Sequence, residues 1–269
     1  MRFPIRAVIF DWAGTTVDHG SRAPARVFVE LFAGAGIPIT VAEARAPMGR
    51  AKRDHIATIL AQPRVAAAWR DAVGRPATDA DVERLYRDFL PRQRAVLAEH
   101  SDVIAGVPEA VADCRRRGLA IGGTTGYTRE LMDVVEPIAR AGGYAPDVSL
   151  CADDVPAGRP APWMIFRACE RLGVYPPAEV LVVDDTPVGI AAGRAAGART
   201  LAVSRTGNAL GLSAAEVAAL PAAELARQLA AIEREFRAAG AEFVIESVAD
   251  LPQFLDRHCA AAAPLTGCR

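Results

Sequence analysis

The sequence predicts an α/β fold: a Rossmann-like, doubly wound parallel sheet core with an inserted helical cap domain. Two observations lead to this prediction. Apolar runs of strand length alternate with longer segments of helical periodicity, which is typical of βαβ units whose parallel sheet is covered on both faces. The first two of these runs are separated by about 100 residues, which is too long for a single crossover and indicates an insertion.

Six apolar runs are predicted to form the strands of the core: 6–12, 119–125, 148–155, 179–185, 198–204 and 242–248. Helices are expected between them, at 107–117, 128–141, 161–172 and 187–196. A last helix is expected to end near His258.

The long interval after the first strand is predicted to be helical. Its apolar residues recur at spacings of three and four, as on the buried faces of amphipathic helices, in 23–36, 49–61, 63–74 and 79–100. Asp79 and Asp81 suit the start of the last of these helices, and Gly74-Arg75-Pro76 suits the break before it. The predicted domains are therefore a core of 1–20 and 100–258, a cap of 21–99, and a C-terminal tail of 259–269.

Composition narrows the classes of function. The chain has 269 residues, of which 51% are hydrophobic, and a net charge of −1, so it lacks the basic balance typical of a nucleic-acid binder. Its apolar runs are shorter than a membrane span, and its start lacks the layout of a signal peptide. The five cysteines are odd in number and without CxxC spacing, which favours reduced intracellular thiols. We expect a cytoplasmic protein with a small-molecule substrate and neither nucleic-acid nor membrane partners.

Polar residues follow four predicted strands, where ligands bind in an open parallel sheet. They are Asp11, the Thr124-Thr125-Gly126 segment, Arg159 and the Asp184-Asp185 pair. Carboxylates can hold Mg²⁺, while hydroxyls, backbone amides and an arginine can hold a phosphoryl group. Each residue alone could be an ordinary helix cap, but together at matching strand ends they predict a phosphoryl site.

Lysine is nearly absent from the chain. Lysine and arginine together number 31, and Lys52 is the one lysine among them. Arginine can replace lysine as a surface charge but not as a nucleophile, because the guanidinium does not lose its proton in proteins. Unless its survival is chance, Lys52 therefore indicates a need for a neutral amine. His55, three residues later, lies on the same face of the predicted helix and could move protons, or could simply be packed there.

The segments "DWAGTTVD", "TTGYTRE", "GRPAPWM" and "VDDT" occur in this order and resemble the four motifs of the haloacid-dehalogenase superfamily. Nearly the whole chain resembles one of its families, the phosphonatases, including "AEARAPMGRAKRDHI" in the cap and "DDVPAGRPAPWM" in the core. This resemblance implies hydrolysis of the C–P bond of phosphonoacetaldehyde to acetaldehyde and phosphate. It further implies a Schiff base on Lys52, an aspartyl-phosphate on Asp11, a Mg²⁺ cofactor and a homodimer.

The site residues expected from the strand ends and from the resemblance form three groups. The catalytic group is Asp11, Lys52 and His55; the substrate-binding group is Thr125, Gly126, Tyr127, Arg159, Met48 and Gly49; the metal ligands are Asp11, the backbone carbonyl of Ala13, and Asp185. Met48 could equally serve only in packing.

The chain departs from the wider superfamily at two positions. Ala13 stands where phosphatases have a second aspartate, the acid for an alcohol leaving group, and Gly189 stands where the fourth motif usually has a later acid. Asp184 is expected to replace part of that later acid. Two alternatives remain open at this point: a Mg²⁺-dependent phosphatase or phosphomutase acting on a small phosphate ester, and a catalytically inactive phosphate-binding module.

Overall fold

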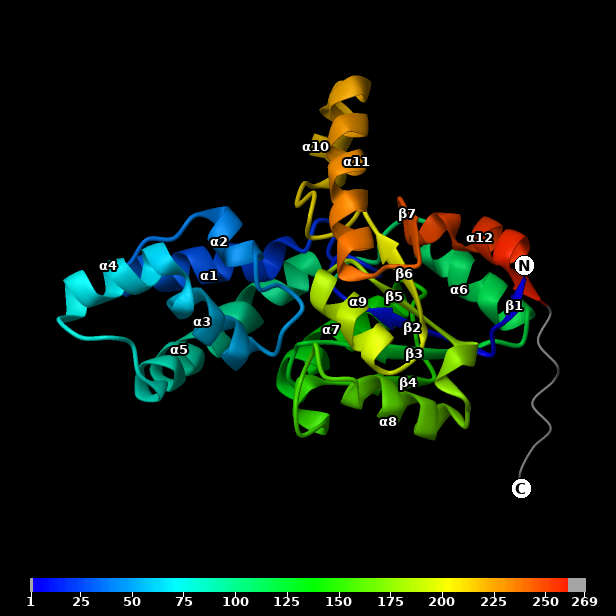
Figure 1. Cartoon of the computed structure of the whole chain (residues 1–269), viewed down its shortest axis with the longest axis horizontal. Coiled ribbons are helices and arrows are strands. Elements are labelled where there is room, and N and C mark those ends of the chain that lie inside the picture. Colours follow the sequence, from blue (N-terminus) through cyan, green and yellow to red (C-terminus); the bar gives the residue numbers. More distant parts are fainter. Residues whose placement is uncertain (1, 261–269) are drawn as a thin grey trace.

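The computed structural model describes residues 2–260. It contains a sheet flanked by helices, and a group of helices to one side of that sheet (Figure 1). Among the described residues, no helix is both long and apolar enough to cross a membrane.

The core is a six-stranded sheet in which every strand pair is parallel. The strands are β2 (Ala7–Asp11), β3 (Ala120–Thr124), β4 (Val148–Leu150), β5 (Val180–Asp184), β6 (Arg199–Val203) and β7 (Phe243–Ile245). Their spatial order is β4-β3-β2-β5-β6-β7, which is the doubly wound order with its switch point between β2 and β5. The predicted fold class is confirmed.

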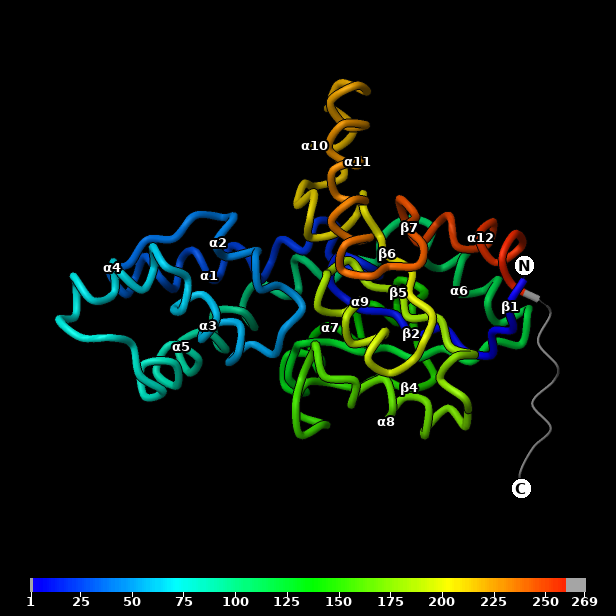
Figure 2. Tube along the Cα trace, viewed as in Figure 1, coloured from blue at the N-terminus to red at the C-terminus, as the bar shows by residue number. Residues whose placement is uncertain are grey.

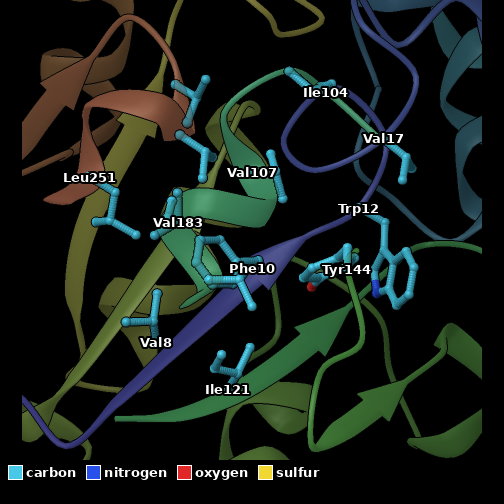
Figure 3. Close-up of a cluster of buried hydrophobic side chains, with 14 of the residues drawn as sticks. Val8, Phe10, Trp12, Val17, Ile104, Val107, Ile121, Tyr144, Val183 and Leu251 are labelled. Atoms are coloured by element: carbon cyan, nitrogen blue, oxygen red, sulfur yellow. The ribbon is translucent and has the colours of Figure 1, made fainter. Parts of the chain in front are cut away.

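Helices cover both faces of the sheet. The first face carries α6 (Val107–Arg116), α7 (Arg129–Ala141) and α12 (Leu251–His258), and the second carries α8 (Trp163–Leu172) and α9 (Pro187–Ala195). Side chains of β2 alternate between the two faces because successive residues of a strand point in opposite directions. Val8 and Phe10 pack into the hydrophobic cluster on the first face, beside Tyr144 and Leu251 (Figure 3), whereas Ile9 packs into the hydrophobic cluster on the second face.

The lateral helices enclose a hydrophobic core of their own. They are α1 (Arg22–Gly34), α2 (Val41–Arg45), α3 (Lys52–Ala61), α4 (Pro63–Val73) and α5 (Asp79–Leu97). Phe28, Ile59, Trp69 and Phe89 are buried there, separately from the sheet. Two connections, residues 12–21 and 98–106, join these helices to the sheet (Figure 2). This separate core agrees with the inserted helical cap of the predicted fold class, and the predicted domain bounds stay a prediction.

The start of α5 agrees with its sequence signal. Thr78 precedes the helix, and its side chain and that of Asp81 form a capping box, with the Thr78 backbone N–H donating to Asp81 Oδ2 at 2.8 Å. Such reciprocal bonds satisfy the free N–H groups of a first helical turn.

Two helices between β6 and β7 were not predicted. They are α10 (Ala214–Ala219) and α11 (Ala222–Ala239), and α11 projects away from the sheet (Figure 1). Ile232 and Phe236 of α11 are buried, and Leu225 and Leu229 pack against the same cluster. These four residues recur at spacings of four, three and four, which is the pattern of an amphipathic helix.

The ends of the described chain also differ from expectation. β1 (Phe3–Pro4) pairs in parallel with β8 (Cys259–Ala260), so the first two residues of the expected tail form a strand. The rest of that tail, residues 261–269, lies outside the described residues. Short 3₁₀ helices complete the structure at Ala98–His100, Ala152–Asp154, Pro177–Glu179 and Val248–Asp250.

Candidate active site

Three buried aspartates meet at the switch point of the sheet. Asp11 ends β2, Asp184 ends β5 and Asp185 follows it, and one carboxylate oxygen from each lies within 4.8 Å of the other two. Burial raises the pKa of Asp184 to about 7 and that of Asp185 well above its usual range, and the neighbouring carboxylate of Asp11 adds to both shifts. Crowded carboxylates of this kind suit a divalent cation, which supplies the missing positive charge.

The Asp185 carboxylate is fixed from two directions. Thr15 Oγ1 donates to its Oδ1 at 3.2 Å, and the backbone N–H of Asn208 donates to its Oδ2 at 2.7 Å. A Cβ atom on Gly14, whose φ is +92°, would lie only 2.1 Å from Asp185 Oδ2. Glycine is therefore needed at position 14 both for the turn and for the approach of this carboxylate.

Asp184 explains one departure from the superfamily pattern. Its Oδ1 accepts hydrogen bonds from Thr186 N at 2.8 Å and from Thr186 Oγ1 at 2.7 Å. A Cβ atom on Gly189 would lie within 2.3 Å of three atoms of the Asp184 carboxylate group. The absence of a side chain at position 189 thus gives Asp184 its place in the cluster.

Arg159 links the aspartates to β3. Its Nη1 lies 2.5 Å from Asp11 Oδ1 and 3.2 Å from Asp184 Oδ2, while its Nη2 donates to the backbone and side-chain oxygens of Thr124, each at 2.7 Å. Burial alone would lower the pKa of Arg159, but Asp11 and Asp184 outweigh it and raise the pKa. The guanidinium therefore stays charged at the base of the site.

Lys52 approaches from the cap as the first residue of α3. It is 4% exposed, and its Nζ lies 4.7 Å from the centre of the Tyr127 ring. Burial lowers the pKa of Lys52 to about 7; Asp11 opposes this shift and Arg159 adds to it. The helix macrodipole also disfavours a cation in a first turn. A substantial fraction of this amine is consequently neutral near neutral pH.

One cavity joins the cap lysine to the core aspartate. Its lining includes every predicted substrate-binding residue, together with Asp11, Ala13 and Lys52; the lining residues are Asp11, Ala13, Ser21, Pro24, Met48, Gly49, Lys52, Thr125, Gly126, Tyr127, Arg159 and Thr186. Its volume is about 20 Å³, enough for about one water molecule. The cap and core are closed on each other here.

Two glycines permit this closure. A Cβ atom on Gly49 of the cap would lie 2.4 Å from Thr186 Oγ1 of the core, and one on Gly126 of the core would lie 2.4 Å from the backbone oxygen of Arg50. The turn that holds Gly126 is fixed by Thr125, whose Oγ1 accepts a hydrogen bond from Tyr127 N at 3.1 Å.

His55 does not line this cavity. Its ring stacks on Phe28 with centroids 3.9 Å apart, and its Nε2 lies 2.8 Å from the backbone oxygen of Ala44. Because a carbonyl only accepts, we assign the proton to Nε2; Nδ1 is buried without a partner among the described residues. Burial and the nearby Lys52 hold the pKa of His55 well below its usual range. Proton transfer by His55 stays a prediction.

Comparison with known proteins gives the family. A profile of the haloacid dehalogenase-like hydrolases matches residues 5–197. The chain belongs to this family.

Within the haloacid dehalogenase-like hydrolases, the chain is similar to proteins that are named for one activity. The chain is 49% identical over 247 residues to a phosphonoacetaldehyde hydrolase of Paraburkholderia xenovorans, covering 92% of each chain. It is 47% identical over 262 residues to one of Hahella chejuensis, covering 96% of this chain and 89% of the other. A crystal structure of a phosphonoacetaldehyde hydrolase-like protein from Oleispira antarctica has a TM-score of 0.92 at 39% identity, covering 94% of this chain and 92% of the other.

Some residues that shape this haloacid dehalogenase-like site were not predicted from the sequence. Thr15 and Thr186 stand inside the quoted motifs, so their hydroxyls could have been proposed as partners of the aspartates. Asn208 gives no signal, because it lies in a loop about 20 residues beyond Asp185 and contributes a backbone N–H that every non-proline residue has.

Proposed function

We propose that the protein hydrolyses the C–P bond of phosphonoacetaldehyde, releasing acetaldehyde and phosphate. The observation that carries this proposal is the burial of the one lysine of the chain, with a lowered pKa, in the same closed cavity as the strand-end Asp11. The names and high identity of the curated relatives support the same activity.

We propose Mg²⁺ as the cofactor, held by Asp11, the backbone carbonyl of Ala13, and Asp185. The crowded, buried carboxylates fit such an ion by their chemistry. When bound, the ion would neutralise charge on the phosphoryl oxygens. Arg159 and the turn at Thr125 and Gly126 would hold the remaining oxygens.

Lys52 would act first. Its neutral amine adds to the aldehyde carbon, and uptake of one proton with loss of water leaves a protonated imine on Nζ; hydrolysis of that iminium at the end of the cycle returns the proton. This step needs an unprotonated amine, which burial of Lys52 provides near neutral pH.

Asp11 would act second. One carboxylate oxygen attacks phosphorus, the C–P bond breaks, and its electron pair moves through the carbon to the imine nitrogen, leaving an enamine on Lys52 and an aspartyl-phosphate on Asp11. Water then attacks phosphorus and releases phosphate. Protonation and hydrolysis of the enamine release acetaldehyde and restore Lys52, so the sum consumes one water.

This route gives a reason for Ala13. An ester leaves as an alkoxide and needs a nearby acid, typically worth ~10²–10⁴-fold in rate, whereas the enamine stores its electron pair on nitrogen. A proton carried by His55 would have to pass through Nδ1, since Nε2 is bonded to Ala44.

We further propose a homodimer and a cytoplasmic location. Resemblance to the phosphonatases supports the homodimer. The free thiols of Cys114, Cys151 and Cys169 support a reducing compartment.

The test is phosphate release from phosphonoacetaldehyde with Mg²⁺, compared with release from small phosphate esters. We expect the phosphonate to be preferred and Lys52→Arg, which keeps the charge, to be inactive. Borohydride reduction in the presence of substrate should attach a single adduct to the peptide that contains Lys52. Faster ester turnover, an active Lys52→Arg variant or an unmodified Lys52 would contradict the proposal.

A further inference from the structure

We propose that Arg45 is a positioning residue that latches the cap onto the core and thereby places Lys52 against Asp11. This inference rests on the proposed function for the roles of Lys52 and Asp11, but the contacts that define the latch do not depend on it.

The guanidinium of Arg45 reaches from the last residue of α2 into the core. Its Nη1 donates to the backbone oxygen of Gly20 at 2.8 Å and to Asn208 at two oxygens, Oδ1 at 2.9 Å and the backbone oxygen at 3.2 Å. Its Nη2 donates to the backbone oxygen of Gly211 at 3.0 Å. One cap side chain thus binds both the first connection between the domains and the loop after β6.

The fit around this side chain is close. A Cβ atom on Gly211, whose φ is +69°, would lie 2.7 Å from Arg45 Cζ. The partners of Arg45 are neutral oxygens, and within residues 2–260 it forms no ion pair. A planar guanidinium holds five N–H donors in a rigid fork, against three on an ammonium group, so it can serve several fixed carbonyls at once.

On the core side, the latch leads to the carboxylate cluster. Asn208 accepts from Arg45 through its side chain while its backbone N–H donates to Asp185 Oδ2 at 2.7 Å. Asn208 therefore contacts both Arg45 of the cap and Asp185, a proposed metal ligand.

On the cap side, the latch leads to Lys52. The carbonyl of Ala44, the residue before Arg45, receives the Nε2–H of His55 at 2.8 Å. His55 and Lys52 lie on one face of α3, three residues apart. This gives His55 a place in the latch: it holds the helix that carries Lys52 to the segment that carries Arg45.

The experiment compares Arg45→Ala with Arg64→Ala. Arg64, on α4, is the matched control. Its Nε lies 2.6 Å from Oε1 of Glu43, which belongs to α2 as Arg45 does, so this ion pair lies inside the cap and away from the core. Three quantities are measured: hydrogen exchange of segments 18–23 and 205–212, phosphate release, and borohydride trapping of Lys52 with acetaldehyde.

For Arg45→Ala we expect faster exchange in both segments and kcat/KM for phosphate release lowered about 10- to 100-fold, the effect of losing charge-assisted hydrogen bonds. Trapping should persist, because imine formation needs only Lys52. Added guanidinium ion should restore part of the turnover. Arg64→Ala should leave exchange in the two segments and turnover close to those of the wild type.

Unchanged exchange in the two segments, or unchanged turnover, would overturn the latch, as would loss of trapping in parallel with turnover. If Arg45→Ala does not fold, the Asn208→Ala variant tests the latch instead, because it removes the Oδ1 acceptor of Arg45. Unchanged hydrogen exchange of segment 205–212 in this variant would refute the positioning role of Arg45. If the wild type releases no phosphate from phosphonoacetaldehyde, the proposed function fails, while the exchange data still decide the latch.

Discussion

Lys52 occupies a position that costs stability. It is buried, it begins a helix where the macrodipole opposes a cation, and the surrounding cap side chains are largely apolar. Arginine elsewhere carries the positive charge of the chain. The structure thus supplies a physical reason for keeping one lysine, namely an amine that loses its proton near neutral pH.

The lowered pKa of Lys52 predicts the pH dependence of activity. The logarithm of kcat/KM should rise with pH and level off near pH 7, falling about tenfold per pH unit below it, because only the neutral amine reacts. A rise that continues toward pH 10 would indicate an ordinary lysine and contradict this prediction.

The same shift predicts the pH dependence of stability. Between about pH 7 and the usual lysine pKa of about 10.4, the unfolded state binds more protons than the folded state, so stability rises with pH in this window. Lys52→Met should therefore raise the free energy of unfolding by about 4 kcal/mol at pH 7, and the gain should shrink toward pH 10. Urea denaturation at both pH values checks this; a gain independent of pH would point to packing instead.

Gly189 offers a second test at the residue scale. Gly189→Ala would force a methyl group against the Asp184 carboxylate, so we expect phosphate release to fall at least about tenfold. Gly34→Ala is the control, since Gly34 also lies in a helix, as the last residue of α1, and its nearest atom is 3.8 Å away. Normal activity of Gly189→Ala would show that Asp184 does not need its present place.

At the scale of elements, the sequence predicted the strands and where their polar ends meet. β2 and β5 are nearly continuous apolar runs that stop at Asp11 and Asp184, so both the sheet and the aspartate pair could be read from the pattern. The stripe of Leu225, Leu229, Ile232 and Phe236 would equally have allowed α11 to be predicted. The latch at Arg45 could not be predicted, because its partners are oxygens of loop residues and all but Asn208 Oδ1 belong to the backbone.

The cap is expected to unfold in part by itself, because its core is separate. Trp69 is 1% exposed between the cap helices, so Trp69→Ala should cost about 3–5 kcal/mol. Hydrogen exchange should become faster in α3 and α4 while the sheet remains protected. Trp163→Ala, at a tryptophan that is 48% exposed on α8, should have little effect. Equal loss of protection in the sheet would mean that the two parts unfold together.

At the scale of the whole molecule, the reacting groups come from both sides of a closed interface. Asp11 and Arg159 belong to the core and Lys52 to the cap, and the cavity between them has room for about one water. A substrate can therefore enter only when the two parts separate, and chemistry requires that they close again.

The buried carboxylates predict that a divalent cation stabilises the entire fold. Saturating Mg²⁺ should raise Tm by several degrees, since binding at 100 times Kd contributes about 2.7 kcal/mol. Asp185→Asn should remove this increment, whereas Asp113→Asn, at an acid paired with Arg116 and Arg117 on α6, should keep it. An equal rise in Tm with NaCl at matched ionic strength would show that the increment comes from charge screening and not from Mg²⁺ binding.

Because Lys52 is buried, chemical modification of its amine reports how often the cap and core separate. No other side-chain primary amine exists in the chain, and this one lies beneath Tyr127 at the junction of the two parts. A bulky acylating reagent can reach it only while the interface is apart. The rate of side-chain acylation at saturating reagent is therefore the frequency with which the enzyme opens, measurable by mass spectrometry without any attached probe.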